Sequence, residues 1–156
     1  MALSQADVLS KLRLVIEEVT GLKRVYGQAE TDGNRIPPTI PECPAAVVMA
    51  GPTLEYILQP GGQRHTYEVR VLLFQDGADI GERAAVIAPL VDSLIATFVG
   101  HVTLGGLVNH VRFVRSDGFG TISWGTRNDG SPREYLGTEI TLEVSEQATA
   151  SPAAGS

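Results

Sequence analysis

The first 21 residues carry apolar side chains at the spacing of an amphipathic helix. Their apolar positions recur every three or four residues and form one stripe: Leu9, Leu12, Val15, Ile16 and Val19. Ser4 and Asp7 give an S-x-x-D capping pattern before this stripe, and Gly21 follows it at a position where helices commonly end. The pattern predicts a helix that packs one face on the rest of the protein.

A second helical pattern covers residues 79–98. Asp79 is the predicted cap, and the predicted buried stripe is Ala84, Ile87, Ala88, Val91, Leu94, Ile95 and Phe98. Pro89 falls opposite this stripe, where the missing backbone hydrogen bond bends a helix with its convex side toward solvent. We therefore predict one bent helix over a twisted sheet, rather than a helix broken in two at Ala88.

Several segments have the alternating or continuously apolar pattern of β-strands: residues 45–49, 53–59, 65–75, 108–115 and 133–146. Leu72 and Phe74 make the end of the third segment apolar on both faces, which predicts that this half of the strand is covered on both sides. Gly137, inside the last segment, is interpreted as a β-bulge.

The order of these elements predicts a single α+β domain over residues 1–146. We expect a mainly antiparallel sheet of four to five strands, with two helices packed on one face, in the order α-β-β-α-β-β. An extended hairpin arm is expected between the last two strands. Residues 147–156 have the composition of a flexible C-terminal tail.

Residues 27–44 form a long connection with four prolines and no apolar periodicity. A structureless connection beyond roughly 12–15 residues is usually functional or disordered. Two interpretations stay open, a contact loop and a mobile surface loop. Ile36 and Ile40 give the segment apolar anchors that a loop in solvent does not need.

The arm, residues 117–134, carries Phe119, Ile122 and Trp124 in a glycine-rich stretch. Trp and Arg are enriched at protein interfaces, and arginines stand beside these residues at positions 115, 127 and 133. The alternative is a hairpin that folds back on its own core. We hypothesise a protein-interface set from the loop and the arm: Ile36, Pro37, Pro38, Ile40, Phe119, Ile122 and Trp124.

Composition and charge exclude several classes of protein. The 156 residues hold 12 Lys and Arg against 18 Asp and Glu, a net charge of −6, which disfavours binding to nucleic acid through phosphate neutralisation. Charged residues make up only 19%, below the usual quarter, so we expect part of the surface to lie against other protein. Glu139 and Glu143 share one face of the last strand and predict an acidic face there.

No catalytic, cofactor or metal motif is found in the sequence. The chain lacks a G-x-S-x-G elbow and a phosphate-binding loop, and its three histidines have no metal-ligand spacing. Cys43, the single cysteine, is interpreted as an inert thiol. No stretch is long and apolar enough to span a membrane, and the N-terminus lacks the basic start of a secretory signal. We expect no membrane association and synthesis in the cytoplasm.

Three segments and the element order resemble the tail terminator proteins of long, non-contractile-tailed bacteriophages. The stretch PECPAAVVMAGPTLEYIL resembles the proline-rich lead of that family into a first strand, and RHTYEVRVLLFQ and REYLGTEITLEV look like its central and last strands. The resemblance covers about residues 3–146. Pro89 and the long connection at 27–44 depart from the family pattern.

This resemblance implies a structural virion protein of the tail and neck, assembled in the host cytoplasm, without enzymatic activity or cofactor. It implies a hexameric ring that caps the tail tube protein, stops tube polymerisation and joins the tail to the head-completion (stopper) protein. DNA passes through the lumen without specific binding, and Glu139 and Glu143 are the acidic lumen candidates. The alternatives are a neighbouring neck protein, either head-closure or head–tail adaptor, and a small-ligand-binding or enzymatic α+β domain.

Overall fold

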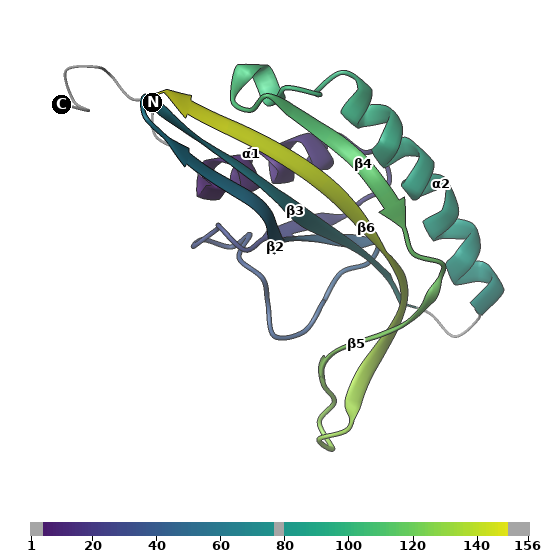
Figure 1. The fold of residues 1–156 in the computed structure, drawn as a ribbon. Helices are drawn as coiled ribbons and strands as arrows, with labels where there is room; N and C mark the ends of the chain where they lie inside the picture. Colours follow the sequence, from purple (N-terminus) through teal and green to yellow (C-terminus); the bar gives the residue numbers. More distant parts are fainter. Residues whose placement is uncertain (1–4, 77–79, 150–156) are drawn as a thin grey trace.

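The computed structural model describes residues 5–76 and 80–149, arranged in the order α-β-β-β-α-β-β-β (Figure 1). The helices are α1 (Gln5–Glu17) and α2 (Ile80–Val99), and a short 3-10 turn, η1 (Leu104–Gly106), follows α2. The strands are β1 (Arg24–Gly27), β2 (Ala45–Gln59), β3 (Gly62–Gln75), β4 (His110–Ser116), β5 (Gly120–Thr126) and β6 (Pro132–Thr149). The α+β prediction is confirmed. The caps predicted at Ser4 and Asp79 lie outside the described residues.

The strands form one mixed, mostly antiparallel sheet in the order β1-β2-β3-β6-β4. Only the β1–β2 pair is parallel among the strands of the described residues. The long strand β6 is shared along one edge, because residues 132–137 pair with β5 and residues 140–145 pair with β4. Figure 1 shows β5 and the start of β6 projecting together from the end of the sheet.

The predicted sheet of four to five strands is wrong in number, because the described residues form a sheet of six strands. The four residues of β1 were missed since so short a run carries no periodicity. The segments 45–49 and 53–59 are one strand, whose register shifts twice between Ala50 and Glu55 instead of ending at Gly51-Pro52. The predicted arm contributes the sixth strand, β5.

The main core lies between the two helices and one face of the sheet. Every apolar residue of the predicted α1 stripe is buried there, although α1 ends at Glu17 and Val19 follows it. In α2 the buried residues are Ile87, Leu90, Leu94 and Phe98, while Ala88 is exposed, contrary to the predicted stripe. Pro89 is exposed inside one continuous helix, as predicted. Burial of this apolar face is the main force that holds the helices on the sheet.

The opposite face of the sheet, called here the open face, is covered at one end only. Leu72 and Phe74 lie on it, and Phe74 is fully buried under residues from the 27–44 connection and the arm. The prediction that this half of β3 is covered on both sides is therefore confirmed. At the other end of the sheet, strand β6 continues to Thr149. Residues 147–149 therefore belong to a strand and not to the predicted tail. Residues 150–156 lie outside the described residues.

No helix in the described part of the chain has the length and apolar character needed to cross a membrane.

Candidate interaction surfaces

The first candidate surface is the covered end of the open face, called here the loop–arm cluster. Its fully buried members come from four strands and the 27–44 connection: Tyr26, Ile40, Ala45, Val47, Phe74 and Tyr135. Partly buried residues pack around them: Ile36, Cys43, Met49, Leu72, Ile122 and Trp124. The cluster is a second, smaller core on the face that carries no helix.

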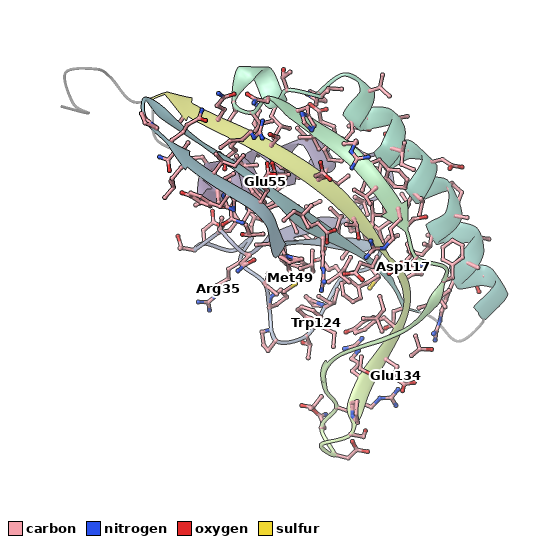
Figure 2. All side chains as sticks on the ribbon, in the orientation of Figure 1. Arg35, Met49, Glu55, Asp117, Trp124 and Glu134 are labelled. Carbon is pink, nitrogen blue, oxygen red and sulfur yellow. The ribbon has the colours of Figure 1, made fainter. Side chains whose placement is uncertain are left out.

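Two aromatic side chains fasten the connection to the arm. The Tyr135 hydroxyl donates a hydrogen bond to the carbonyl oxygen of Ile40 (3.0 Å) and accepts one from the Ile40 amide (3.2 Å). The Trp124 indole N–H donates to the carbonyl oxygen of Pro37 (3.0 Å), and its ring meets that of Phe74 edge-on at 5.5 Å. Figure 2 shows Trp124 in the angle between the arm and the sheet. These contacts satisfy backbone groups of a proline-rich segment that forms few ladder bonds of its own.

Two glycines allow this packing. A Cβ at Gly137 would stand 2.1 Å from the Leu73 carbonyl oxygen and 2.7 Å from Cδ1 of Ile122. The β3–β6 register runs through Gly137 without a shift, so the predicted bulge is wrong, and the glycine serves a close approach instead. Gly125 has φ +75°, and a Cβ there would stand 2.2 Å from the Pro38 carbonyl oxygen. Both positions exclude a side chain because the loop and the arm fit closely.

The predicted interface set divides into residues that pack inside the chain and residues that stay accessible. Ile40 is fully buried, so its place in an intermolecular surface is a wrong prediction. Ile36, Pro37, Ile122 and Trp124 are partly buried, and the alternative of an arm folded back on its own core describes the last two better. Pro38 and Phe119 are exposed, Phe119 by 47%. The structure does bring the loop and the arm together, as neighbours of each other.

The open face beyond the cluster carries both signs of charge. Glu139 and Glu143 lie on it, as predicted, but Arg70 Nε stands 3.4 Å from a Glu139 carboxylate oxygen and Arg112 donates to Glu143 at 2.8 Å. Arg64 and Glu55 form a further pair at 3.0 Å. The prediction of an acidic face is therefore corrected to a face of alternating charges. Sequence spacing placed the carboxylates on one face but could not show which arginines come from neighbouring strands.

The distal half of the β2–β3 hairpin is the second candidate surface. Large apolar side chains stand exposed on β2, with exposed fractions of 49% for Leu54, 51% for Tyr56 and 74% for Leu58. Sequence reasoning missed them because alternation predicts a buried strand face wherever apolar residues recur. This part of β2 lies beyond the strand β1, which pairs only with residues 45–48.

A buried polar cluster lies under these exposed residues. The rings of Tyr56, His65 and Tyr67 lie in a row, tilted by 42° to one another, with ring centres 4.7 and 4.5 Å apart. The Tyr67 hydroxyl donates to the buried Glu146 carboxylate at 3.1 Å. A ring nitrogen of His65 lies 3.0 Å from the Thr53 hydroxyl. Burial lowers the pKa of His65, against the opposing effect of the Glu146 charge. Burial, and then the Glu146 charge, raise the pKa of Tyr67.

Two surface hollows lie at the arm. One has a volume of about 480 Å³ and is lined by polar groups that include Asp76, Arg127 and Arg133. A second, of about 440 Å³, lies over Leu72 and Gly137. Within the described residues no three His, Cys, Asp or Glu side chains gather as a metal site would require. Burial, followed by the Asp76 charge, raises the pKa of Cys43, which leaves less of the reactive thiolate.

Comparison with models of known protein families and with curated proteins gave no match to this chain.

Proposed function

We propose that this chain is a structural subunit of the tail-terminator type. Six copies form a ring that caps the tail tube, stops its polymerisation and joins the tail to the head-completion protein. The observation that carries the proposal is the hairpin with Leu54, Tyr56 and Leu58, each about half exposed or more. Contiguous large apolar side chains on a surface mark sites of protein contact.

The placement of the resembling segments supports the same proposal. The three stretches that resemble tail terminators fall on β2, β3 and β6, which are consecutive neighbours at the centre of the sheet. The resemblance therefore concerns one continuous structural unit rather than scattered pieces. The 27–44 connection, one of the two features that depart from the family pattern, is packed against the arm at one end of that unit.

In the proposed ring the open face lines the passage for DNA. Its carboxylates Glu139 and Glu143 stand beside Arg70 and Arg112, so the wall presents alternating charges at short range. Such a wall holds phosphate weakly, because binding through the DNA backbone depends on an excess of cationic groups. DNA then moves through the lumen without specific binding.

In this proposal, capping occurs because the subunit has only one surface that binds the tube protein. The ring binds the last layer of tube protein through one surface and offers no equivalent surface to a further layer. Pro38 and Phe119 are exposed at the end of the molecule formed by the loop and the arm, and we assign them to contact with tube or head-completion protein. In this proposal the chain has no catalytic role, and it acts in the virion neck after assembly in the host cytoplasm.

Two measurements test the function. Native mass spectrometry of the purified chain should give about six copies in one particle, consistent with closed cyclic symmetry. Electron microscopy of tails assembled without the protein should show overlong tubes, and adding the wild-type chain back should restore a fixed length. Tails of normal length that fail to join heads would contradict a terminator and favour a head–tail adaptor.

A further inference from the structure

Exposed large apolar residues gather in two places on the molecule. The first is the hairpin patch, defined as Leu54, Tyr56 and Leu58 on β2. The second is the α2–β4 patch, defined as Val99, Val102 and Phe113, with exposed fractions of 76%, 45% and 40%. The Val111 amide donates to the Val102 carbonyl oxygen at 2.7 Å, which places Val102 alongside β4.

The exposed side of α2 next to this patch is poor in charge. After Arg83, the helix carries a single charged residue, Asp92, before it ends at Val99. Its exposed positions include Ala85, Ala88 and Ala96. A helix that faces water usually carries charged residues on that side, and a helix apolar all round is usually buried.

Tyr56 and Leu58 of the hairpin patch and Phe113 of the α2–β4 patch lie on the helix-covered side of the sheet, at opposite edges, while Leu54 stands at a register shift of β2. Tyr56 pairs with His65, which stacks on Tyr67 of the main core, and Phe113 pairs with the core residue Leu142. The distal half of β2 is an edge because β1 ends at Gly27, and β4 is the other edge. Figure 1 shows the hairpin tip and α2 on opposite sides of the molecule. One subunit therefore cannot bring its own two patches together.

On the open side, the same two edges expose charged side chains of opposite sign, each paired within its own chain. Glu55, on the β2 edge, has a side chain that is 52% exposed and pairs with Arg64. Arg112 and Arg115, on the β4 edge, have side chains that are 61% and 54% exposed and pair with Glu143 and Asp117. If two copies meet at these edges with their helices on the same side, apolar residues face apolar residues and Glu55 approaches the arginines. The existing ion pairs then extend across the contact.

We propose that the hairpin patch of one subunit packs on the α2–β4 patch of a second copy of this chain. Because the two surfaces differ, the contact runs head to tail, and repeating it with a fixed rotation closes a ring. This inference rests on the ring of the proposed function and specifies which surfaces build it. It also places all open faces on the same side of the ring wall.

Aspartate substitutions at exposed positions test the contact with the full chain. Leu58→Asp disables the hairpin patch, and Val102→Asp disables the α2–β4 patch. Leu14→Asp is the matched control, since Leu14 is 48% exposed on α1 and lies in neither patch. Circular dichroism and thermal unfolding establish that each variant is folded, and native mass spectrometry gives its copy number.

We expect each patch variant to fall from about six copies to one, while Leu14→Asp keeps the ring. An equimolar mixture of Leu58→Asp and Val102→Asp should give mixed dimers, because each variant retains one intact surface. Rings that persist in either patch variant would overturn the inference, as would a mixture without mixed dimers at concentrations well above those of wild-type assembly. A dimer formed by one patch variant alone would overturn it too.

The outcomes separate this inference from the function on which it rests. A folded wild-type chain that stays monomeric contradicts the proposed ring itself. Intact rings in both patch variants leave the ring standing and reject only these surfaces. Mixed dimers together with tails of normal length in the absence of the protein support the contact and reject the capping function.

Discussion

The two ends of β3 have opposite environments on the open face. At the end with Leu72 and Phe74, the 27–44 connection and the arm cover the sheet and form the loop–arm cluster. At the end with Arg64, the open face carries exposed ion pairs, and on the other side of the sheet the neighbouring strand leaves Leu58 74% exposed. The open face of β3 is thus covered by its own chain at one end and exposed to solvent at the other.

This difference separates residues that stabilise the subunit from residues available to a partner. Long loops cost little closure entropy for their length, so a proline-rich connection can be held down by a few good contacts. Tyr135 and Trp124 supply such contacts at the covered end. Substitutions at the covered end should therefore lower the free energy of unfolding, and substitutions at the hairpin should change assembly instead.

Phe74→Ala gives the largest expected effect on stability. Phe74 is fully buried, and truncation of a buried Phe typically costs about 3–5 kcal/mol through lost burial and a cavity. Leu58→Ala, at the other end of the same hairpin, should change the free energy of unfolding by less than about 0.5 kcal/mol, as surface substitutions do. Urea unfolding of the two variants as monomers checks the contrast, and equal losses would contradict it.

Gly137→Ala should be the next most damaging change. Its Cβ would overlap the Leu73 carbonyl oxygen at 2.1 Å, so the arm or the β3–β6 ladder has to move. Overpacking of this kind costs about 1–3 kcal/mol and occasionally more. Gly118→Ala is the matched control, because a Cβ at Gly118 meets nothing within 4 Å. A Gly137→Ala variant as stable as Gly118→Ala would show that the close fit of arm and sheet is not needed.

The main features of the fold were predictable because periodicity records burial. The α1 stripe, an α2 that is unbroken at Pro89 and the double coverage of Leu72 and Phe74 all follow from spacing and are present in the structure. Strand number was not predictable, since β1 has four residues and β2 passes through Gly51-Pro52 by a shift of register. Whether β1 forms and whether β2 is continuous both depend on hydrogen bonds to neighbouring strands, and those strands lie far away in the sequence.

The candidate surfaces were predictable only in part, for the same physical reason. Exposure of Trp124 was inferred from its glycine-rich flanks, yet glycine at 125 serves to admit the Pro38 carbonyl and lets the tryptophan fold inward. Glu143 was expected on an acidic face, but β4 brings Arg112 beside it. In each case the neighbour that decides the environment comes from a distant part of the chain.

Tyr135→Phe isolates the hydrogen bonds that hold the loop at the covered end. The change keeps the aromatic ring of the side chain but removes the hydroxyl. The buried amide and carbonyl of Ile40 then lose their hydrogen bonds to that hydroxyl. Leaving buried backbone groups unpaired costs about 1–3 kcal/mol. Tyr56→Phe is the control at the hairpin, where the hydroxyl donates a solvent-exposed hydrogen bond to the Gln63 side chain, and it should cost less than about 0.5 kcal/mol. Hydrogen exchange should become faster at Ile40 in the first variant, and unchanged exchange there would contradict this role.

The smallest effect is expected from His65, at the open end of β3. Burial lowers its pKa below the ordinary value of 6.5, so below that pH the unfolded chain binds a proton more readily than the folded one. Stability contributed by neutral His65 is therefore present above pH 6.5 and decreases as the pH falls through the lowered pKa. The groups that face His65 are Thr53, Tyr56, Tyr67 and Glu146, and the Glu146 charge opposes the shift of the His65 pKa without reversing it.

Urea unfolding at pH 7.5 and pH 5.5 checks this effect. The free energy of unfolding should fall more for the wild type than for His65→Gln, because glutamine does not titrate. Parallel losses in the two proteins would mean that His65 is as readily protonated in the folded chain as in the unfolded one, and that its stack under Tyr56 does not keep it neutral.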